Sequence, residues 1–219
     1  SGVQFVAAEA VGFVTAGEAV TGVRTGDGRV FDAGAVLLAG GAWSAPLGAA
    51  LGVTLPVHAK KRDVFVLDTP AELPGCPLVI DPSGFWFRPE GRLLLAGGPP
   101  RGDDADDLPL DAIDHGLFDE GLWPVLAARV PALQALRVRS AWAGYYEMNA
   151  FDHNGLAGRL PGWRNAYTAC GFSGHGMQQS PAVGHSMARL MAGQAAPLIE
   201  PLTPQRLVSG TPLWEAQVI

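Results

Sequence analysis

A glycine-rich loop near residue 171 has the composition of a ligand-binding turn. Glycines stand at positions 171, 174 and 176, after a β-prone stretch and before a helical pattern. Glycine lets the backbone approach a ligand closely, and a helix start carries about half a positive charge, which favours an anion or a carbonyl oxygen gaining negative charge. The spacing matches neither G-x-G-x-x-G nor the P-loop, so a plain tight turn is the alternative interpretation.

The side chains around this loop predict little acid–base or metal chemistry. Ser173 and His175 are two positions apart, a poor placement for a nucleophile and its base, and the loop lacks the G-x-S-x-G elbow of hydrolases. Asp152 and His153 offer metal-binding groups together with His175, but Asp and His in such a turn more often cap the loop. We expect neither hydrolase chemistry nor a metal site.

A second glycine pair, Gly40 and Gly41, ends the continuous apolar run that starts at Ala35. Such a run is typical of a strand that is covered on both faces in a parallel sheet. The two glycines let the backbone come close to a ligand, and the alternative is a simple turn from strand to helix.

The elements that position these loops follow from the hydrophobic pattern. Short β-prone runs at 3–6, 10–13, 20–25 and 29–32 predict a small antiparallel meander, with a hairpin turn at Thr25–Gly28. The runs 64–67, 85–88 and 92–96 predict an antiparallel sheet, and 110–130 predicts short helical pieces. Residues 165–170 predict a strand, and the apolar spacing at 183, 187, 190 and 191 predicts a helix ending before Gly193.

The composition indicates a turn-rich globular protein. Of 219 residues, 48% are hydrophobic, which is enough for a core, and 29 glycines with 18 prolines imply many tight turns. A net charge of −6 with only two lysines argues against a nucleic-acid partner. No apolar run is long enough to span a bilayer, and the two cysteines fit neither a disulfide framework nor a zinc site, so we expect a cytoplasmic protein.

Two oppositely charged segments are expected to be solvated. Asp103–Asp107 is a carboxylate run without the glycine and terminal glutamate of an EF-hand loop, so it predicts a solvated loop. Lys60–Arg62 is a basic cluster that predicts a solvated strand end.

The two glycine motifs resemble a known family. Residues 39–44, Ala-Gly-Gly-Ala-Trp-Ser, resemble the segment that ends a flavin-domain strand in the D-amino-acid-oxidase-like FAD-dependent oxidoreductases, which include sarcosine and glycine oxidases and dimethylglycine dehydrogenase. Residues 171–184 resemble that family's C-terminal flavin loop and helix. Residues 141–155 are similar to a subgroup of FAD-dependent oxidoreductase domain-containing proteins associated with assembly of respiratory complex I.

This resemblance implies a fold class and a domain organisation. The fold is expected to be α/β, or α+β overall, with part of a FAD-binding Rossmann-type domain, a β-meander and an antiparallel-sheet substrate domain. Residues 1–50 and 141–219 are expected in the flavin domain, and 51–140 in the substrate domain. The family's G-x-G-x-x-G unit is absent from the sequence. The chain is therefore expected to be the C-terminal part of a longer enzyme, with the missing N-terminal half as its partner.

The resemblance also implies which residues meet the substrate and the cofactor. Catalytic roles are expected for Tyr145, Glu147 and Gln178. Contacts with FAD are expected from Ala39, Gly40, Gly41, Trp43, Gly144, Gly171, Ser173, Gly174, His175, Gly176, Met177 and Gln178. In particular, the backbone N–H groups near Gly176 and Met177 are expected to face the N1–C2=O edge of the flavin.

Three departures from the family pattern bear on the reaction. Sarcosine oxidases attach the flavin through a cysteine where this chain has Tyr145, so non-covalent FAD is expected. The lysine that activates oxygen falls at Leu95, and the lysine that binds the substrate carboxylate falls at Gln178. These departures imply a dehydrogenase rather than an oxidase, and they argue against a simple N-methylglycine substrate.

The implied function is a flavin-dependent oxidoreductase that oxidises a C–N bond of an amine or N-methyl amino acid by hydride transfer to FAD. The chain alone is expected to be inactive. The alternative is an assembly or scaffold protein that keeps a structural flavin and binds a protein partner. The substrate, the electron acceptor and any protein partner stay open at this point.

Overall fold

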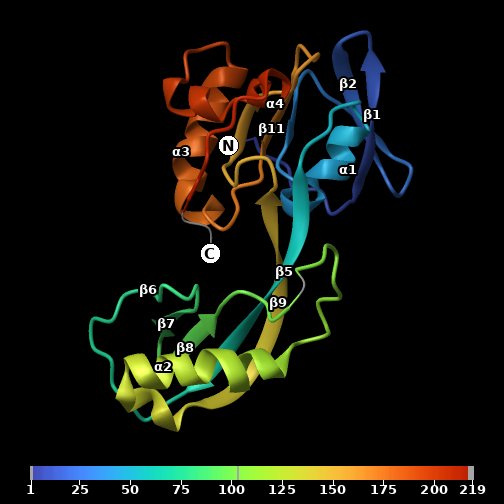
Figure 1. The fold of residues 1–219 in the computed structure, drawn as a ribbon. Coiled ribbons are helices and arrows are strands. Elements are labelled where there is room, and N and C mark those ends of the chain that lie inside the picture. Colours follow the sequence, from blue (N-terminus) through green and yellow to red (C-terminus); the bar gives the residue numbers. More distant parts are fainter. Residues whose placement is uncertain (1, 103, 217–219) are drawn as a thin grey trace. The chain divides into compact units, whose positions relative to one another are not determined.

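The computed structural model describes residues 2–102 and 104–216, and these form two compact units. The split unit combines the chain up to His58 with the chain from Glu147 on, and the middle unit is Ala59–Tyr146. The chain passes between the units within two strands, β5 (Val57–Asp68) and β9 (Arg137–Asn149) (Figure 1). The units are a geometric division, and the expected domains at 1–50, 51–140 and 141–219 stay a prediction.

A three-stranded sheet lies at the centre of the split unit. Its order is β10-β11-β4, with β4 at Val36–Leu38, β10 at Leu156–Arg159 and β11 at Ala166–Cys170. Strand β11 is parallel to β4 and antiparallel to β10. The expected parallel strand within 35–41 is confirmed, but its two faces differ, because Leu37 is 39% exposed while its two neighbours are buried.

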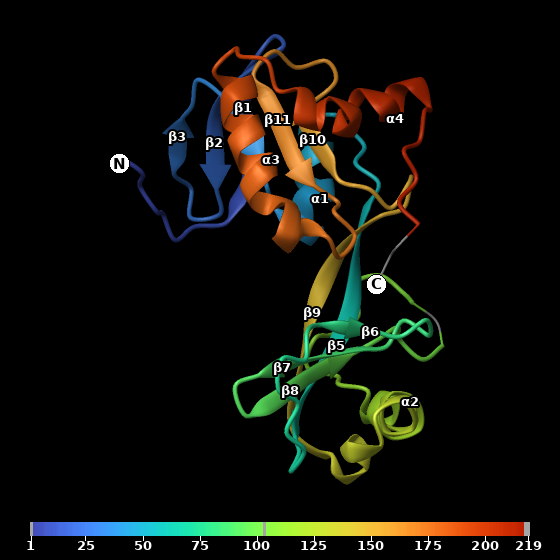
Figure 2. The ribbon, with the colours of Figure 1, turned by 90° about the vertical axis from the view of Figure 1, so that its left-hand side faces the viewer.

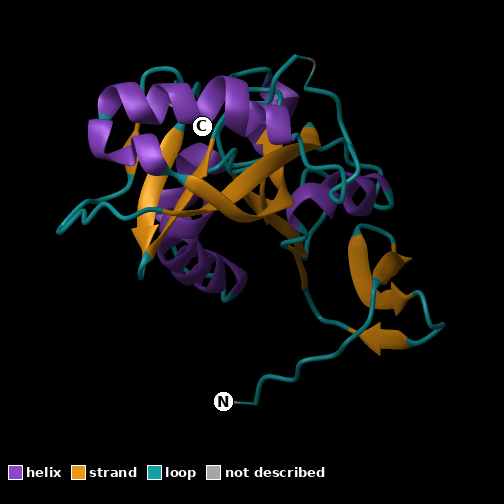
Figure 3. Ribbon diagram, turned by 90° about the horizontal axis from the view of Figure 1, so that it is seen from below, coloured by secondary structure: helices purple, strands orange, loops and turns teal. Residues whose placement is uncertain are grey.

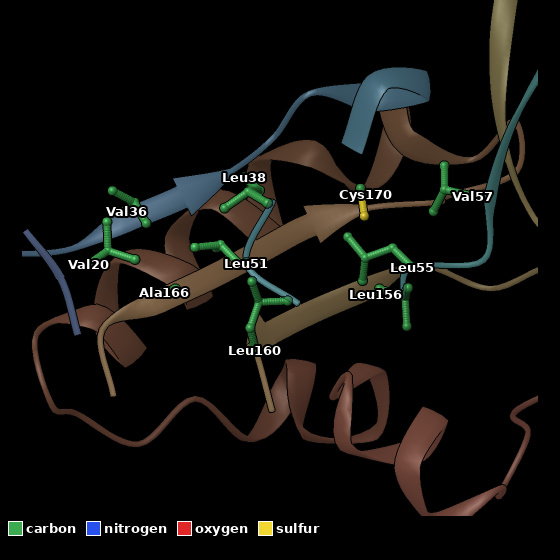
Figure 4. Packing of buried hydrophobic residues seen from close by; sticks show 10 residues of the cluster. All are labelled: Val20, Val36, Leu38, Leu51, Leu55, Val57, Leu156, Leu160, Ala166 and Cys170. Carbon is green, nitrogen blue, oxygen red and sulfur yellow. The ribbon is translucent and has the colours of Figure 1, made fainter. Parts of the chain in front are cut away.

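Each face of this sheet meets a different cluster, because successive strand residues point to opposite faces. Figure 4 shows one cluster, in which the buried side chains of β4 and β11 pack with Leu51 and Leu55 beyond α1 (Ser44–Ala49). On the other face Tyr167 packs with Val183 and Met187 of α3 (Gly176–Met191) and with η4 (Pro197–Leu202). Figure 2 shows α3 in front of β11. The helix predicted over 183–191 is confirmed.

An antiparallel meander and short helices complete the split unit. Strands β1 (Ala10–Ala16), β2 (Ala19–Thr25) and β3 (Val30–Asp32) pair in that order, and Gly28 N donates to Thr25 O at 2.9 Å in the predicted turn. The strand expected at 3–6 is wrong, because the described residues 2–9 pair with no strand and Phe5 is 96% exposed. The remaining elements are η1 (Gly41–Trp43) and α4 (Gln205–Ser209).

The middle unit is a five-stranded sheet with one face covered by helices. Its order is β6-β7-β8-β5-β9, where β6 is Val79–Ile80, β7 is Trp86–Glu90 and β8 is Leu93–Gly97. The covering elements are η2 (Leu117–Leu122), α2 (Trp123–Arg129) and η3 (Pro131–Ala135). The predicted antiparallel sheet and short helical pieces are confirmed. Figure 3 shows the strands of the whole chain in orange and its helices in purple.

The two charged segments of the sequence bind each other within this unit. Arg62 donates two hydrogen bonds to the Asp104 carboxylate, at 2.9 and 3.0 Å, and Lys60 Nζ lies 2.6 Å from Asp106 Oδ1. Asp106 and Asp107 are exposed, as expected of a solvated loop, but the ion pairs with Lys60 and Arg62 were not predicted. Mutual neutralisation stabilises neighbouring carboxylates that would otherwise repel one another. Asp103 lies outside the described residues.

No helix in the described parts of the chain combines the length and apolar character needed to cross a membrane.

Candidate functional site

The first glycine motif links β4 to η1. Gly41 has φ of +55°, a left-handed conformation that a side chain would strain, and Trp43 N donates to Gly40 O at 3.0 Å. Ala39 is exposed, and Trp43 is 60% exposed. The motif is thus a tight turn, and the side chains of Ala39 and Trp43 beside it are exposed.

The second glycine motif is a strained loop between β11 and α3. Gly171 and Gly174 have φ of +71° and +94°, and Ser173, a non-glycine residue, has φ of +50°. His175 N donates to Phe172 O at 2.9 Å, which closes the loop at the helix start. A non-glycine residue in this region is uncommon and needs support from its surroundings.

The start of α3 offers open hydrogen-bond donors. His175 occupies the N-cap position, and among the described residues its side chain makes no capping hydrogen bond. The first N–H groups of a helix have no partner inside the helix and carry its partial positive charge. Met177 is 86% exposed and Gln178 is also exposed, so this end of the 16-residue helix is accessible.

The side chain of Glu147 lies beside both glycine motifs. Its carboxylate Oε2 accepts a hydrogen bond from Gly171 N at 2.9 Å, and its carbonyl oxygen accepts one from Ser173 N at 3.2 Å. A Cβ added at Gly41 would lie 3.9 Å from Oε2, and one added at Gly176 would lie 3.5 Å from Oε1. One carboxylate is therefore bonded to the second motif and lies near the first, about 130 positions away in sequence.

Burial changes the ionisation of this carboxyl group. Removal from water raises the pKa of Glu147, while the backbone N–H groups of Gly171 and Phe172 act in the opposite direction. The charged carboxylate gains hydrogen bonds but loses hydration. Its observed contacts position the loop, and the catalytic role expected for Glu147 stays a prediction.

A network of buried polar side chains is hydrogen-bonded to the loop at residues 171–176. Asn149 N donates to Ser173 Oγ at 3.0 Å, and Asn149 Nδ2 donates to Asp152 Oδ1 at 2.9 Å. Arg206 Nε in turn donates to Asp152 Oδ2 at 2.8 Å. Asp152 is thus the centre of a buried ion pair, and the loop-capping interpretation is confirmed in part, because Asn154 N also donates to it at 3.2 Å.

Sequence reasoning missed Asn149 and Arg206 as parts of this site. Asn149 ends a strand that the alternating pattern did not predict, and Arg206 lies 54 positions beyond its carboxylate partner. The one available signal was an Asn-x-x-Asp spacing in a turn, which suggests local capping only. A buried arginine cannot be told from an exposed one without the tertiary structure.

The other expected site residues divide between the units. Gly144 and Tyr145 belong to the middle unit, where Tyr145 Oη donates to Leu108 O at 2.8 Å. The residues brought together in the split unit are Gly41, Glu147, Gly171, Ser173 and Gly176. The roles of all these residues toward substrate and cofactor stay predictions.

The split unit has features that fit a flavin. The accessible start of α3 supplies donors suited to a carbonyl or phosphate oxygen, and Gly41 and Gly176 leave space that a side chain would fill. The exposed side chains of Trp43 and Met177 add apolar surface next to these backbone segments. The residues that would hold FAD are therefore those of the two glycine motifs.

The chain matches the family model "DAO: FAD dependent oxidoreductase" over residues 1–190. It is 40% identical over 201 residues to FAD-dependent oxidoreductase domain-containing protein 1 of Xenopus laevis, covering 84% of this chain and 40% of the relative. It is 44% identical over 172 residues to the Bos taurus protein of the same name, covering 71% of this chain and 35% of that relative. The chain thus spans well under half the length of these relatives.

Two solved structures share the fold. L-proline dehydrogenase from P. horikoshii has a TM-score of 0.83 at 26% identity and covers 94% of this chain and 55% of its own. Glycine oxidase from Geobacillus kaustophilus has a TM-score of 0.78 at 24% identity and covers 89% of this chain and 51% of its own. The family match, the relatives and the fold agree, and the chain belongs to the DAO family of FAD-dependent oxidoreductases.

Proposed function

We propose that the full protein oxidises a C–N bond of an amine or N-methyl amino acid with non-covalent FAD, as a dehydrogenase rather than an oxidase. The observation that carries this proposal is the position of Glu147, which is hydrogen-bonded to the second glycine motif and lies near Gly41 of the first, beside the accessible start of α3. When bound, FAD supplies the acceptor for the hydride that leaves the carbon next to nitrogen.

The chain's contribution is to bind and orient. Glu147 holds Gly171, the residue that follows β11 and begins the loop, so the first N–H groups of α3 keep a fixed direction. Fixed donors at a helix start stabilise negative charge without reorganisation at the moment of reaction. In this proposal the N–H groups near Gly176 and Met177 serve the N1–C2=O edge of the flavin.

The environments of both lysines support dehydrogenase behaviour. Lys60 Nζ lies against Asp106 and the Asp104 carbonyl oxygen, and Lys61 Nζ lies 3.3 Å from Asp63 Oδ1. Each ammonium group is therefore committed to an ion pair. Tyr145, at the position of the flavin-linking cysteine, supports non-covalent binding. The neutral Gln178 argues against recognition of a substrate carboxylate by charge at that position.

The test uses the full-length protein and its visible absorption under anaerobic conditions. The proposal predicts a flavin spectrum that bleaches on addition of an N-methyl amino acid with a larger side chain than N-methylglycine, or of the cyclic secondary amine L-proline. Absence of FAD would refute the proposal. Bound FAD that no amine reduces would also refute it and would favour a structural flavin in an assembly protein.

A matched pair of variants tests the loop itself. A Cβ at Gly176 would lie 3.4 Å from Phe172 Cβ and 3.5 Å from Glu147 Oε1, so the methyl groups of Gly176→Val have little room, whereas a Cβ at Gly184 on the same helix would meet nothing within 4 Å. Gly176→Val is expected to lower FAD occupancy and the flavin reduction potential, and Gly184→Val to leave both unchanged. Equal effects of the two variants would contradict the assignment of this loop to the flavin.

A further inference from the structure

A buried arginine and a buried aspartate lie outside the loop at residues 171–176 but are linked to it by hydrogen bonds. Arg206 on α4 is 5% exposed and Asp152 is fully buried. Arg206 donates from Nε and Nη2 to the two carboxylate oxygens, at 2.8 and 3.2 Å, and from Nη2 to the carbonyl oxygens of Asn154 and Gly155, at 3.0 and 2.8 Å. One guanidinium thus fixes both the carboxylate and the turn that follows it.

The Asp152 carboxylate in turn holds the side chain of Asn149, the last residue of β9. Asp152 Oδ1 accepts from Asn149 Nδ2 at 2.9 Å, and Asn149 Nδ2 also donates to Asn154 O. The Asn149 side-chain oxygen accepts from Phe151 N at 3.0 Å. Asn149 is fully buried, so every polar atom of its amide is directed by these partners.

The last link reaches the strained residue of the loop. Asn149 N donates to Ser173 Oγ at 3.0 Å, and Ser173 Oγ donates to Gly171 O at 3.3 Å. Ser173 is fully buried with φ of +50°, a conformation that costs free energy unless its neighbours hold it. Three residues further along the chain, α3 begins at Gly176.

We propose that Arg206 and Asp152 are positioning residues for the flavin, acting through Asn149 and Ser173 on the direction of the first α3 N–H groups. This inference rests on the proposed function for its last step, from the loop to the flavin. The earlier steps, from Arg206 to Ser173, concern only the chain itself. The two parts therefore need separate measurements.

The first measurement is amide hydrogen exchange in the full-length protein, with or without flavin. Arg206→Lys keeps the charge, but a compact ammonium cannot reproduce the fork that reaches four oxygens. The exposed Arg164→Lys is the matched control. Arg206→Lys is expected to speed exchange at residues 171–177 about tenfold, because local opening becomes easier, while Arg164→Lys leaves it unchanged.

A second variant keeps the test valid if Arg206→Lys does not fold. Ser173→Ala removes the hydroxyl at the loop end and leaves the Arg206–Asp152 pair intact. It is expected to speed exchange at 171–177 but not at 152–155. Faster exchange at 152–155 with unchanged exchange at 171–177 in Arg206→Lys would overturn the inference, because the network would then end at the turn.

The second measurement is the flavin reduction potential by spectroelectrochemistry. Arg206→Lys and Ser173→Ala are each expected to lower it, and the double variant is expected to show no further shift, because both act through one link. Wild-type protein without FAD would refute the proposed function and leave the exchange result standing. Variants with fast-exchanging loops and an unchanged potential would overturn the inference alone.

Discussion

Two glycine-to-alanine substitutions in the split unit should change its stability in opposite directions. A Cβ at Gly155 would lie 2.3 Å from Cδ1 and 2.4 Å from Cε1 of Phe172, whose side chain is 8% exposed and packs in the α3 cluster. A Cβ at Gly184, in the interior of α3, meets nothing within 4 Å. The same added methyl group therefore meets a buried ring at one site and open space at the other.

The magnitudes follow from packing and from helix propensity. Overpacking of a close-packed interior costs about 1–3 kcal/mol, and the buried Phe172 ring must shift to relieve a contact this short. Replacing glycine by alanine inside a helix stabilises by about 0.5–1 kcal/mol, because the unfolded chain loses freedom. The two variants should therefore differ by about 1.5–4 kcal/mol in the free energy of unfolding.

The assay is equilibrium urea unfolding of the full-length variants, followed by far-UV circular dichroism and tryptophan fluorescence. Gly155→Ala should also retain less FAD, because a Cβ at Gly176 would lie 3.4 Å from Phe172 Cβ, so a displaced ring disturbs the start of α3. Equal unfolding midpoints for the two variants would refute the reasoning. Such a result would mean that the ring moves aside freely and that this part of the core is loosely packed.

Three further predictions concern charge and reactivity. Burial raises the pKa of Glu147, so the protonated carboxyl favours the folded state at low pH, and this contribution to the free energy of unfolding is lost as pH rises above about 4.5. Glu147→Gln should therefore show a smaller loss of stability with rising pH in urea unfolding. Superimposable pH profiles of wild type and variant would contradict the prediction. Burial raises the pKa of Cys170 to about 11, so peptide mapping after alkylation at neutral pH should find the half-buried Cys76 modified and Cys170 intact. Asp104→Asn should cost about 1 kcal/mol or less in low salt, with the difference vanishing at high salt, because its pair with Arg62 is partly exposed.

Local pattern was enough for the elements whose neighbours are near in sequence. The hairpin at Thr25–Gly28, the antiparallel sheet over 64–67, 85–88 and 92–96, and the helix over 183–191 each follow from turn chemistry or periodicity, and the structure has all three. The strand expected at 3–6 failed because a β-prone run needs a partner edge, which propensity does not specify.

The site was predictable only in its backbone elements. Glycines mark places where φ is positive, so the turns at Gly41 and Gly171 were visible from the sequence. That both turns lie near Glu147 was not visible, because it depends on the tertiary arrangement of β4, β9 and β11, which are distant in sequence. The ion pair between Lys60 and Asp106 was not predicted for the same reason. Taken alone, each charged segment is most simply expected to be hydrated.

The buried residue Asp152 also ties the last described residues of the chain to the split unit. Its Oδ2 accepts from Leu213 N at 2.9 Å, and its carbonyl oxygen accepts from Glu215 N at 3.0 Å. The carboxylate is thus bonded by a residue 61 positions later in the sequence, in addition to its donors from Asn149, Asn154 and Arg206. Loss of these last residues would therefore remove one donor from a buried charge and would destabilise the split unit.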